Sequence, residues 1–360
     1  MENPLEKSRS IPSLDGLRAL SVLAVILGHS RAALLDRIPF NAAFRDGSKG
    51  VAVFFVISGF LITHLLLKEL RRDETINLKR FYLRRTFRIF PPFYVFLIIV
   101  AVLGLLHEIQ VTRTMLLIAA TYTWNYARIP ETWTLGHCWS LTLEEQFYLL
   151  WPLCMAKFKL RTNLGIAAAV ILLSPLSRLI TYYAWPSMRE RIDMMLHTHL
   201  DTIMTGCLLA LMLELKIWQR VTKLALSPIA PTVAIAFLFT VDIWAKQRLR
   251  GMYLLSVGIS LENLAIATIL LYVVFRHESP LGKFLNLKPI KHFGMISYSI
   301  YLYQQLFTGP YTRQFPLNML FIVAAAELSY LLVEKPSFRI RDLVQNRIFS
   351  IGKSKPLQQV

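Results

Sequence analysis

An apolar segment near the start of the chain, residues 14–29, carries three ionisable side chains that could do chemistry. In LDGLRALSVLAVILGH they are Asp15, Arg18 and His29. A helix turns by about 100° per residue, so Arg18 and His29 would return to nearly the same face, with Asp15 within about 60° of both. Along the axis Arg18 and His29 would be roughly 16 Å apart. A neutral histidine accepts protons as a general base, and an arginine binds phosphate or developing negative charge.

These three residues have two interpretations. Ionisable groups at membrane depth cost about 2–3 kcal/mol each on insertion scales, so they need a function or a partner. The first interpretation is a catalytic site, with His29 as the base and Asp15 and Arg18 beside it. The second is an Asp15–Arg18 pair that fixes helix packing, together with a hydrogen-bonded core histidine. The segment alone leaves both open.

A second segment, FYLRRTFRIFPP at 81–92, carries Arg84, Arg85 and Arg88 within about 100° of arc on one helical face. Guanidinium groups bind phosphate oxygens in pairs and stack on flat rings, which suits a nucleotide-bearing donor. The alternative is a positively charged anchor that contacts anionic lipid headgroups. We predict that these three arginines bind the cofactor.

A third segment, HCWSLTLEEQFYLLWP at 137–152, places Ser140, Glu144 and Tyr148 four residues apart on one helical face. A carboxylate at membrane depth is costly unless it is paired or protonated, which makes Glu144 a candidate to orient or tune a histidine. An interhelical hydrogen bond is the alternative. Ser140 and Tyr148 are candidate substrate contacts. Trp139 suits either an interface belt or a substrate contact.

The segment VAVFFVISGFLITH at 51–64 adds weaker candidates. Ser58 and Gly59 would let two helix backbones approach closely, as small residues do in membranes. Ser58 is also a candidate substrate contact, although no base neighbours it in sequence to make it a nucleophile. His64 is either a substrate contact or a residue at the lipid interface.

Metal chemistry is not expected. The eight histidines show no metal-ligand spacing, and Cys138, Cys154 and Cys207 show no CxxC pattern. We therefore predict no metal site and no disulfide framework.

The elements that position these residues must be membrane helices. Hydrophobic residues make up 55% of the 360 and charged residues only 17%, with a mean hydropathy of +0.47, which excludes an ordinary soluble domain. We predict an all-α polytopic membrane protein with about ten transmembrane helices. The expected spans are 13–33, 50–68, 89–107, 139–158, 164–184, 194–214, 225–245, 252–275, 293–309 and 317–335.

The formal charge of +18 does not indicate a nucleic-acid partner, because the basic residues gather between the apolar segments. The bias of basic residues toward cytoplasmic loops then places both termini in the cytoplasm. The expected location of the protein is the cell inner (plasma) membrane. The cluster Lys246, Arg248 and Arg250 disagrees, since it would lie outside. The short apolar region 111–128 would be an interfacial or re-entrant piece.

Three segments follow from this pattern. Residues 1–10 are expected to be a cytoplasmic N-terminal segment, and residues 11–338 a transmembrane domain. Residues 339–360 are polar and basic and are expected to be a disordered cytoplasmic tail.

Four segments together resemble the acyltransferase 3 family of polytopic membrane acyltransferases. They are the spacing of Arg18 and His29, SGF at 58–60, RRxxRxxP from Arg84 to Pro91 and WSLxxE from Trp139 to Glu144. HLDTIMTG, FGMISYSIYLY and VEKPSF add weaker matches. The resemblance runs from about residue 11 to 338, and the order and joint presence of the motifs make it specific.

The resemblance implies transfer of an acyl group, usually acetyl, from cytoplasmic acyl-CoA to a hydroxyl of a carbohydrate or other small acceptor. By position, His29 becomes the catalytic imidazole, Arg18 its partner and Glu144 a further active-site residue. The arginines of 81–92 become the site for the donor phosphates. Transfer is either direct, with His29 as the base, or through an acyl-imidazole.

Two departures from the family pattern matter. Many relatives have a histidine where this chain has Tyr303–Gln304–Gln305, so a mechanism that uses one there does not carry over. Some relatives also carry an esterase-like domain outside the membrane, for which 360 residues leave no room. We therefore expect the membrane domain to act alone, as a homo-oligomer, or with glycan-assembly proteins.

Two other classes of protein remain as alternatives. Buried Asp, Arg, Glu and His also form proton relays, as in a proton-coupled transporter or flippase, although no inverted repeat is evident. A catalytically inactive scaffold of a glycan-assembly complex is the third possibility. Consumption of acetyl-CoA that depends on an acceptor would distinguish an enzyme from both.

Overall fold

The computed structural model describes residues 11–30, 47–129, 132–217, 219–308 and 316–350, which form helices and no strands. In chain order the α-helices are α2 Leu14–His29, α4 Ser48–Asp73, α5 Leu78–Leu105, α6 Arg113–Ala120, α7 Trp133–Gly136, α8 Cys138–Lys157, α9 Leu160–Ala184, α10 Leu196–Glu214, α11 Gln219–Ala225, α12 Ile229–Phe239, α13 Val241–Leu249, α14 Gly251–Tyr253, α15 Ile259–Phe275, α16 Pro280–Leu285, α17 Lys288–Met295, α18 Ser297–Phe307, α19 Leu317–Ser329 and α20 Lys335–Ser350. Short 3₁₀ turns occupy Trp124–Tyr126 and Pro186–Arg191, and π-helical turns occupy Leu254–Gly258 and Tyr330–Glu334.

The protein is a multi-pass membrane protein. In the described part of the chain, 7 helices are long and apolar enough to cross a membrane. They are Ser48–Asp73, Leu78–Leu105, Leu160–Ala184, Pro186–Glu214, Ile229–Leu249, Gly251–Phe275 and Leu317–Ile348. Seven of the ten expected spans are therefore matched by such a helix.

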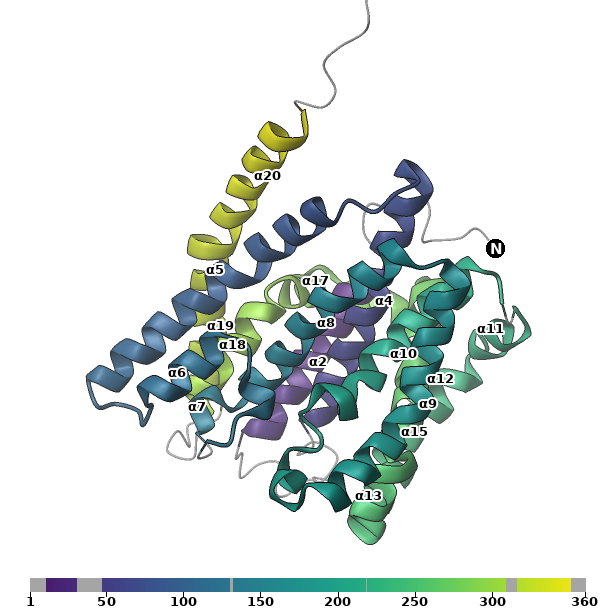
Figure 1. The fold of residues 1–360 in the computed structure, drawn as a ribbon, viewed down its shortest axis with the longest axis horizontal. Helices are drawn as coiled ribbons and strands as arrows, with labels where there is room; N and C mark the ends of the chain where they lie inside the picture. Colours follow the sequence, from purple (N-terminus) through teal and green to yellow (C-terminus); the bar gives the residue numbers. More distant parts are fainter. Residues whose placement is uncertain (1–10, 31–46, 130–131, 218, 309–315, 351–360) are drawn as a thin grey trace, which may run out of the picture.

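The other three expected spans fall on α2, α8 and the pair α17–α18, which do not qualify on their own. α2 has 16 residues and α18 has 11, and Glu144, Glu145 and Gln146 make α8 polar. Figure 1 shows α2, α4 and α8 in the middle of the bundle, with α5 on one side and α9, α12 and α15 on the other. α2 and α8 pack on neighbouring helices over part of their surface and keep exposed leucines on the rest, so the packed faces need less apolar surface than a helix that faces lipid all round.

The direction of α2 defines the two ends of the bundle. Its first turn packs on α17, because Asp15 touches Gly294, and its last residue, His29, lies with its ring centroid 5.3 Å from that of Trp133 in α7. α17 and α20 lie toward one end in Figure 1, and α7 and α13 toward the other. We call these the α17 end and the α7 end. The start of α2 and α20 thus share an end; that this end faces the cytoplasm stays a prediction.

α4 and α10 cross at a pair of glycines. Gly59 packs against the backbone of Ile203, and Gly206 packs against the backbone of Val56 and Phe60, so a Cβ at either glycine would collide with the partner helix. The sequence predicted close approach at Ser58–Gly59, and the structure confirms it. The crossing fixes the middle of α4, which carries Ser58.

We expect Gly59→Leu to reduce the yield of folded protein and its unfolding temperature. The added side chain must push two backbones apart, and such overpacking costs about 1–3 kcal/mol or more. Gly165→Leu is the matched control, because a Cβ at Gly165 of α9 meets nothing within 4 Å. Size-exclusion profiles and thermal unfolding in detergent measure both variants. Equal losses in the two would contradict the crossing as the cause.

The expectation of a disordered tail is wrong for residues 339–350, which continue α20; residues 351–360 and 1–10 lie outside the described residues. No proline or glycine interrupts 337–350, and α20 packs against α5. The Arg341 guanidinium lies 5.2 Å from the Phe338 ring centroid. In the region 111–128, α6 has 8 residues, which is too short to cross a membrane.

Candidate active site

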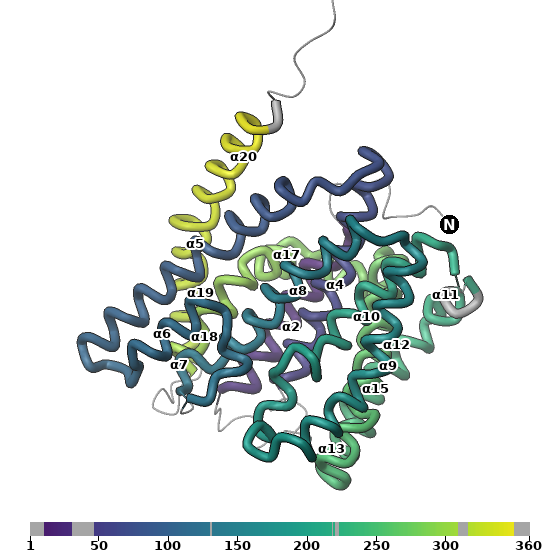
Figure 2. Tube along the Cα trace, in the orientation of Figure 1, coloured from purple at the N-terminus to yellow at the C-terminus, as the bar shows by residue number. Residues whose placement is uncertain are grey.

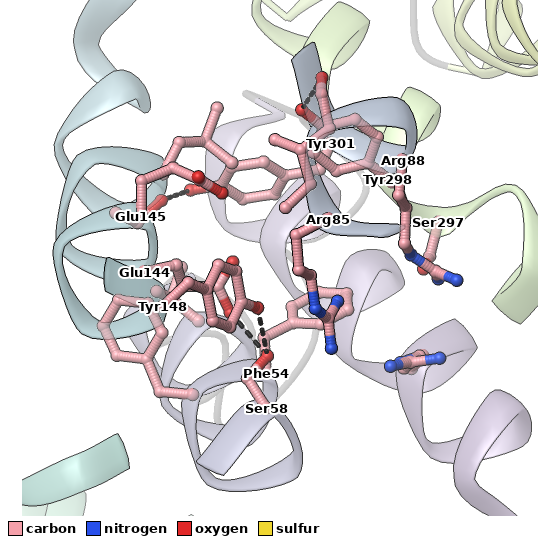
Figure 3. A pocket seen from close by; sticks show the side chains of 16 residues that line it. Phe54, Ser58, Arg85, Arg88, Glu144, Glu145, Tyr148, Ser297, Tyr298 and Tyr301 are labelled. Carbon is pink, nitrogen blue, oxygen red and sulfur yellow. Dashed lines mark hydrogen bonds between the residues drawn. The ribbon is translucent and has the colours of Figure 1, made fainter. Parts of the chain in front are cut away.

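A buried pocket of about 90 Å³ lies between α2, α4, α5, α8 and α18 (Figure 3). Sixteen residues line it, and seven of them are among the site residues predicted from sequence. These seven are Arg18, Ser58, Arg85, Arg88, Ser140, Glu144 and Tyr148. We call this cavity the buried pocket.

Hydrogen bonds join three of these side chains across two helices. Ser58 Oγ donates to Glu144 Oε1 at 2.6 Å, and the Tyr148 hydroxyl donates to Ser58 Oγ at 3.3 Å. Dashed lines in Figure 3 mark both contacts. The Arg85 guanidinium lies over the Tyr148 ring, 4.8 Å from its centroid. The predicted face of α8 therefore exists, and Ser58 is the interhelical partner of Glu144.

Ser140 closes the other end of that face. Its hydroxyl lies 2.5 Å from the hydroxyl of Tyr301 in α18, and it donates to the His137 carbonyl at 3.0 Å. Tyr301 also lines the buried pocket. Because Ser140 is at the start of α8, this contact marks the part of the pocket nearest the α7 end.

Arg18 belongs to the pocket and to an ion pair at once. Its guanidinium lies 3.4 Å from Asp15 Oδ1, so the packing pair considered from sequence is present. The Arg18 side chain also lines the buried pocket, whereas Asp15 is not among the lining residues. Asp15 therefore contacts the site through Arg18.

A larger basic cavity, of about 740 Å³, adjoins the buried pocket toward the α17 end. Its lining includes one carboxylate, Glu69, which accepts from Arg84 Nη2 at 3.3 Å. Seven basic side chains line it: Lys68, Arg71, Arg72, Arg84, Arg85, Arg88 and Arg341. Arg85 and Arg88 line both cavities. We call the larger cavity the basic vestibule, and these two arginines mark its junction with the buried pocket.

His29 lies near the α7 end, outside the lining of the buried pocket. Its Nδ1 is 3.0 Å from Gln304 Oε1, and its ring meets the edge of Trp133. The next residue, Gln305, accepts from the backbone N–H of His137 at 3.0 Å and lies 2.5 Å from His137 Nδ1. Two consecutive glutamines of α18 thus each contact one imidazole, Gln304 that of His29 and Gln305 that of His137.

The Gln304–Gln305 pair and His137 connect His29 to the wall of the buried pocket. The His137 ring lies 5.5 Å from that of Tyr301, which lines the pocket. His137 in turn shares the Gln304–Gln305 pair with His29. The arrangement places an imidazole beyond the pocket, at the end opposite the basic vestibule.

Two predicted substrate contacts lie elsewhere. His64 is buried and stacks on Phe60, with ring centroids 6.2 Å apart, and it is not among the lining residues of the buried pocket. Trp139 lines a third cavity on the far side of Phe55, whose ring centroid is 5.9 Å from its own. The side chain of His64 points to a different side of α4 from that of Ser58. The side chain of Trp139 likewise points to a different side of α8 from that of Ser140.

Sequence reasoning missed several residues of the site. Tyr298 and Tyr301 line the buried pocket, and both fall in FGMISYSIYLY, a segment noted only as a weak family match. Gln304 was noted only as a departure from the family pattern. Nothing in the spacing of His137 indicated that it would be brought to His29. Within the described ranges, no group of three His, Cys, Asp or Glu residues could hold a metal ion.

The motifs, the helical fold and this site agree with a comparison against protein-family models. A model described as an acyltransferase domain, Acyl_transf_3, matches residues 11–333. The chain therefore belongs to this family of membrane acyltransferases, as its four motifs predicted.

Three relatives show where in the family the similarity lies. The O-acetyltransferase OatA of Staphylococcus aureus is 30% identical over 366 residues, which cover 91% of this chain and 57% of OatA. The peptidoglycan O-acetyltransferase OatA of Listeria monocytogenes is 28% identical, over 81% of this chain and 48% of its own length. The putative peptidoglycan O-acetyltransferase YrhL of Bacillus subtilis is 27% identical, over 93% and 56%. The chain spans about half the length of these curated relatives. No solved structure matches it.

Proposed function

We propose that this protein is a membrane O-acetyltransferase of the cell inner (plasma) membrane. It takes the acetyl group from cytoplasmic acetyl-CoA at the α17 end and transfers it to a hydroxyl of a glycan at the α7 end. Peptidoglycan is the acceptor class that the names of two relatives support. The observation that carries the proposal is that Arg85 and Arg88 line both the basic vestibule and the buried pocket, whose Ser140–Tyr301 end lies on the same side as His29.

The vestibule has the charge and size that a coenzyme A nucleotide needs. The phosphates of coenzyme A would be bound by Arg84, Arg85 and Arg88, because guanidinium forks bind phosphate oxygens in pairs. The narrow pantetheine arm would then extend into the buried pocket, whose lining combines Phe54 and Phe55 with polar side chains. A thioester at the tip of that arm would be carried toward the α7 end.

The polar residues of the buried pocket would hold that arm. Its amide groups need hydrogen-bond partners once they leave water, and Ser58, Glu144 and Tyr148 offer both donors and acceptors. Ser140 would lie nearest the thioester. Arg18 would bind a donor phosphate or stabilise the oxyanion, and Asp15 would hold it in place.

His29 would act as the general base. Gln304 Oε1 accepts from Nδ1–H, which leaves Nε2 with a free lone pair. That nitrogen accepts the proton of the acceptor hydroxyl while the hydroxyl oxygen attacks the thioester carbonyl. The C–S bond then breaks, the proton passes to the leaving thiolate, and acetylated acceptor and free coenzyme A are the products.

The test is acceptor-dependent consumption of the donor. Purified protein in nanodiscs is given radiolabelled acetyl-CoA with or without a peptidoglycan tetrasaccharide, and free thiol and labelled glycan are measured. We expect thiol release and glycan labelling in equal amounts, at least tenfold above the rate without acceptor. If unmodified glycan crossed the proteoliposome membrane with no thiol release, the protein would instead be a transporter or flippase.

A further inference from the structure

A third cavity, of about 410 Å³, lies on the other side of α4 from His29 and is not used by the reaction described above. Exposed residues Asp193, Arg250 and Gly251 form its mouth toward the α7 end. Its wall includes Trp139 of α8, His199 and Thr202 of α10, and Glu262 and Asn263 of α15. We call it the α10–α15 cavity.

Several buried polar atoms in this wall have no partner. The Nδ1 atom of His199, the hydroxyl of Thr202 and both amide atoms of Asn263 make no hydrogen bond within the part of the chain that the structure describes. Thr202 is 0% exposed and Asn263 is 2% exposed. Buried polar groups are normally paired, so four such atoms in one cavity indicate a ligand that supplies both donors and acceptors.

The charges of the wall are already balanced. Lys246 Nζ lies 2.8 Å from Glu262 Oε2 and 3.2 Å from Asp242 Oδ2. The remaining pair at the mouth, Arg250 and Asp193, adds one charge of each sign. A ligand with a net charge would gain little here, whereas an uncharged ligand rich in hydroxyl and amide groups would satisfy the unpartnered atoms.

The Trp139 ring is a further feature of the cavity that suits a sugar ligand. An aromatic side chain beside a few fixed polar groups binds a ring that has an apolar face and a polar edge. Trp139, Phe55 and His199 form a three-ring partition, with centroid distances of 5.9, 5.7 and 5.9 Å. Phe55 lines the buried pocket, so this partition separates the donor pocket from the α10–α15 cavity.

α4 lines all three cavities. Ser48 and Ala52 line the α10–α15 cavity, residues between Val51 and Ser58 on another face line the buried pocket, and seven residues between Leu61 and Arg72 line the basic vestibule. At about 1.5 Å per residue, Ala52 is roughly 9 Å from Ser58 and roughly 30 Å from Arg72 along the axis. The α10–α15 cavity thus opens at the end where His29 lies and where the acceptor must arrive.

We propose that the α10–α15 cavity binds one sugar unit of the acceptor glycan, next to the unit that is acetylated. This inference rests on the proposed function. The bound unit stacks on Trp139, and its hydroxyl and acetamido groups bond with Thr202, His199 and Asn263. The glycan then extends from the cavity toward His29. The cavity sets the affinity for the acceptor and has no part in binding the donor.

The experiment uses Thr202→Val and Asn263→Leu with the peptidoglycan tetrasaccharide as probe. We expect each variant to raise the KM for the tetrasaccharide about tenfold, which corresponds to about 1.4 kcal/mol. The KM for acetyl-CoA and the kcat should stay within about twofold of the parent. Thr232→Val, on the exposed face of α12, is the matched control and should change none of these constants.

A binding measurement separates this inference from the proposed function. In nanodiscs without donor, the tetrasaccharide should change the tryptophan fluorescence of the parent, and Trp139→Phe should remove most of that change. If the parent transfers acetyl groups but Thr202→Val and Asn263→Leu leave the tetrasaccharide KM unchanged, the inference is overturned and the proposed function stands. If the tetrasaccharide binds through Trp139 but no acetyl transfer occurs, the proposed function fails and the cavity assignment stands. A fluorescence change produced by zwitterionic lipid and not by the tetrasaccharide overturns the assignment to carbohydrate.

Discussion

The His29→Ala variant should lose acetyl transfer by about 10²–10⁴-fold, the range that general-base catalysis contributes. The ring is the proton acceptor in the proposed reaction, and its partner Gln304 is a neutral amide that cannot serve as a base in its place. The quantity to measure is the rate of labelled glycan formation from acetyl-CoA in nanodiscs. The yield of folded protein and the affinity for coenzyme A should not change, because His29 does not line the donor cavities.

His107→Ala is the control for that experiment, since His107 is exposed and should be dispensable. If His29→Ala transferred acetyl groups at the parental rate, His29 would not be the catalytic base. A second outcome concerns the route of transfer. An acetyl adduct on His29, found by mass spectrometry after mixing with donor alone, would replace direct transfer with an acyl-imidazole.

The Arg85→Ala and Arg88→Ala variants should raise the KM for acetyl-CoA about 10- to 100-fold. Hydrogen bonds to charged groups contribute about 1.5–3 kcal/mol each, and both arginines stand where the basic vestibule meets the buried pocket. The kcat at saturating donor should fall much less, because neither residue reaches His29. Initial rates at varied donor concentration give both constants.

Arg113→Ala is the matched control for the two arginine variants, because Arg113 is exposed on α6 and lines neither donor cavity. The parental KM should also rise with ionic strength, since salt screens phosphate–arginine attraction. If the arginines only anchored the chain to anionic lipid, the variants would show altered membrane insertion with an unchanged donor KM.

Helical spacing was a reliable guide to side chains that share a face over one or two turns. Ser140, Glu144 and Tyr148 line one pocket as their spacing of four predicted. The same geometry explains why two predicted substrate contacts do not line the buried pocket. Trp139 is turned by about 100° from Ser140, and His64 by about 120° from Ser58, so each faces a different neighbour. Arg18 and His29 share an azimuth, but their separation along α2 leaves only Arg18 in the buried pocket.

Contacts between distant segments could not be predicted from spacing. The sequence does not state that Gln304 of α18 will meet His29 of α2, 275 residues away, because only helix packing brings them together. The number of spans, about ten, stays a prediction for a related reason. α2 and α8 are too short or too polar to qualify alone, and only the fold shows that they lie between α5 on one side and α9, α12 and α15 on the other. Figure 2 traces the same arrangement along the Cα path.

The crossing of α4 and α10 at Gly59 and Gly206 has a mechanical consequence. Because a Cβ at either glycine would collide with the partner helix, the backbones of α4 and α10 are in direct contact there. Ser58 precedes Gly59 by one residue and Thr202 precedes Gly206 by four, so this contact fixes the spacing between the buried pocket and the α10–α15 cavity. A substitution that separated the two backbones would therefore disturb both cavities together.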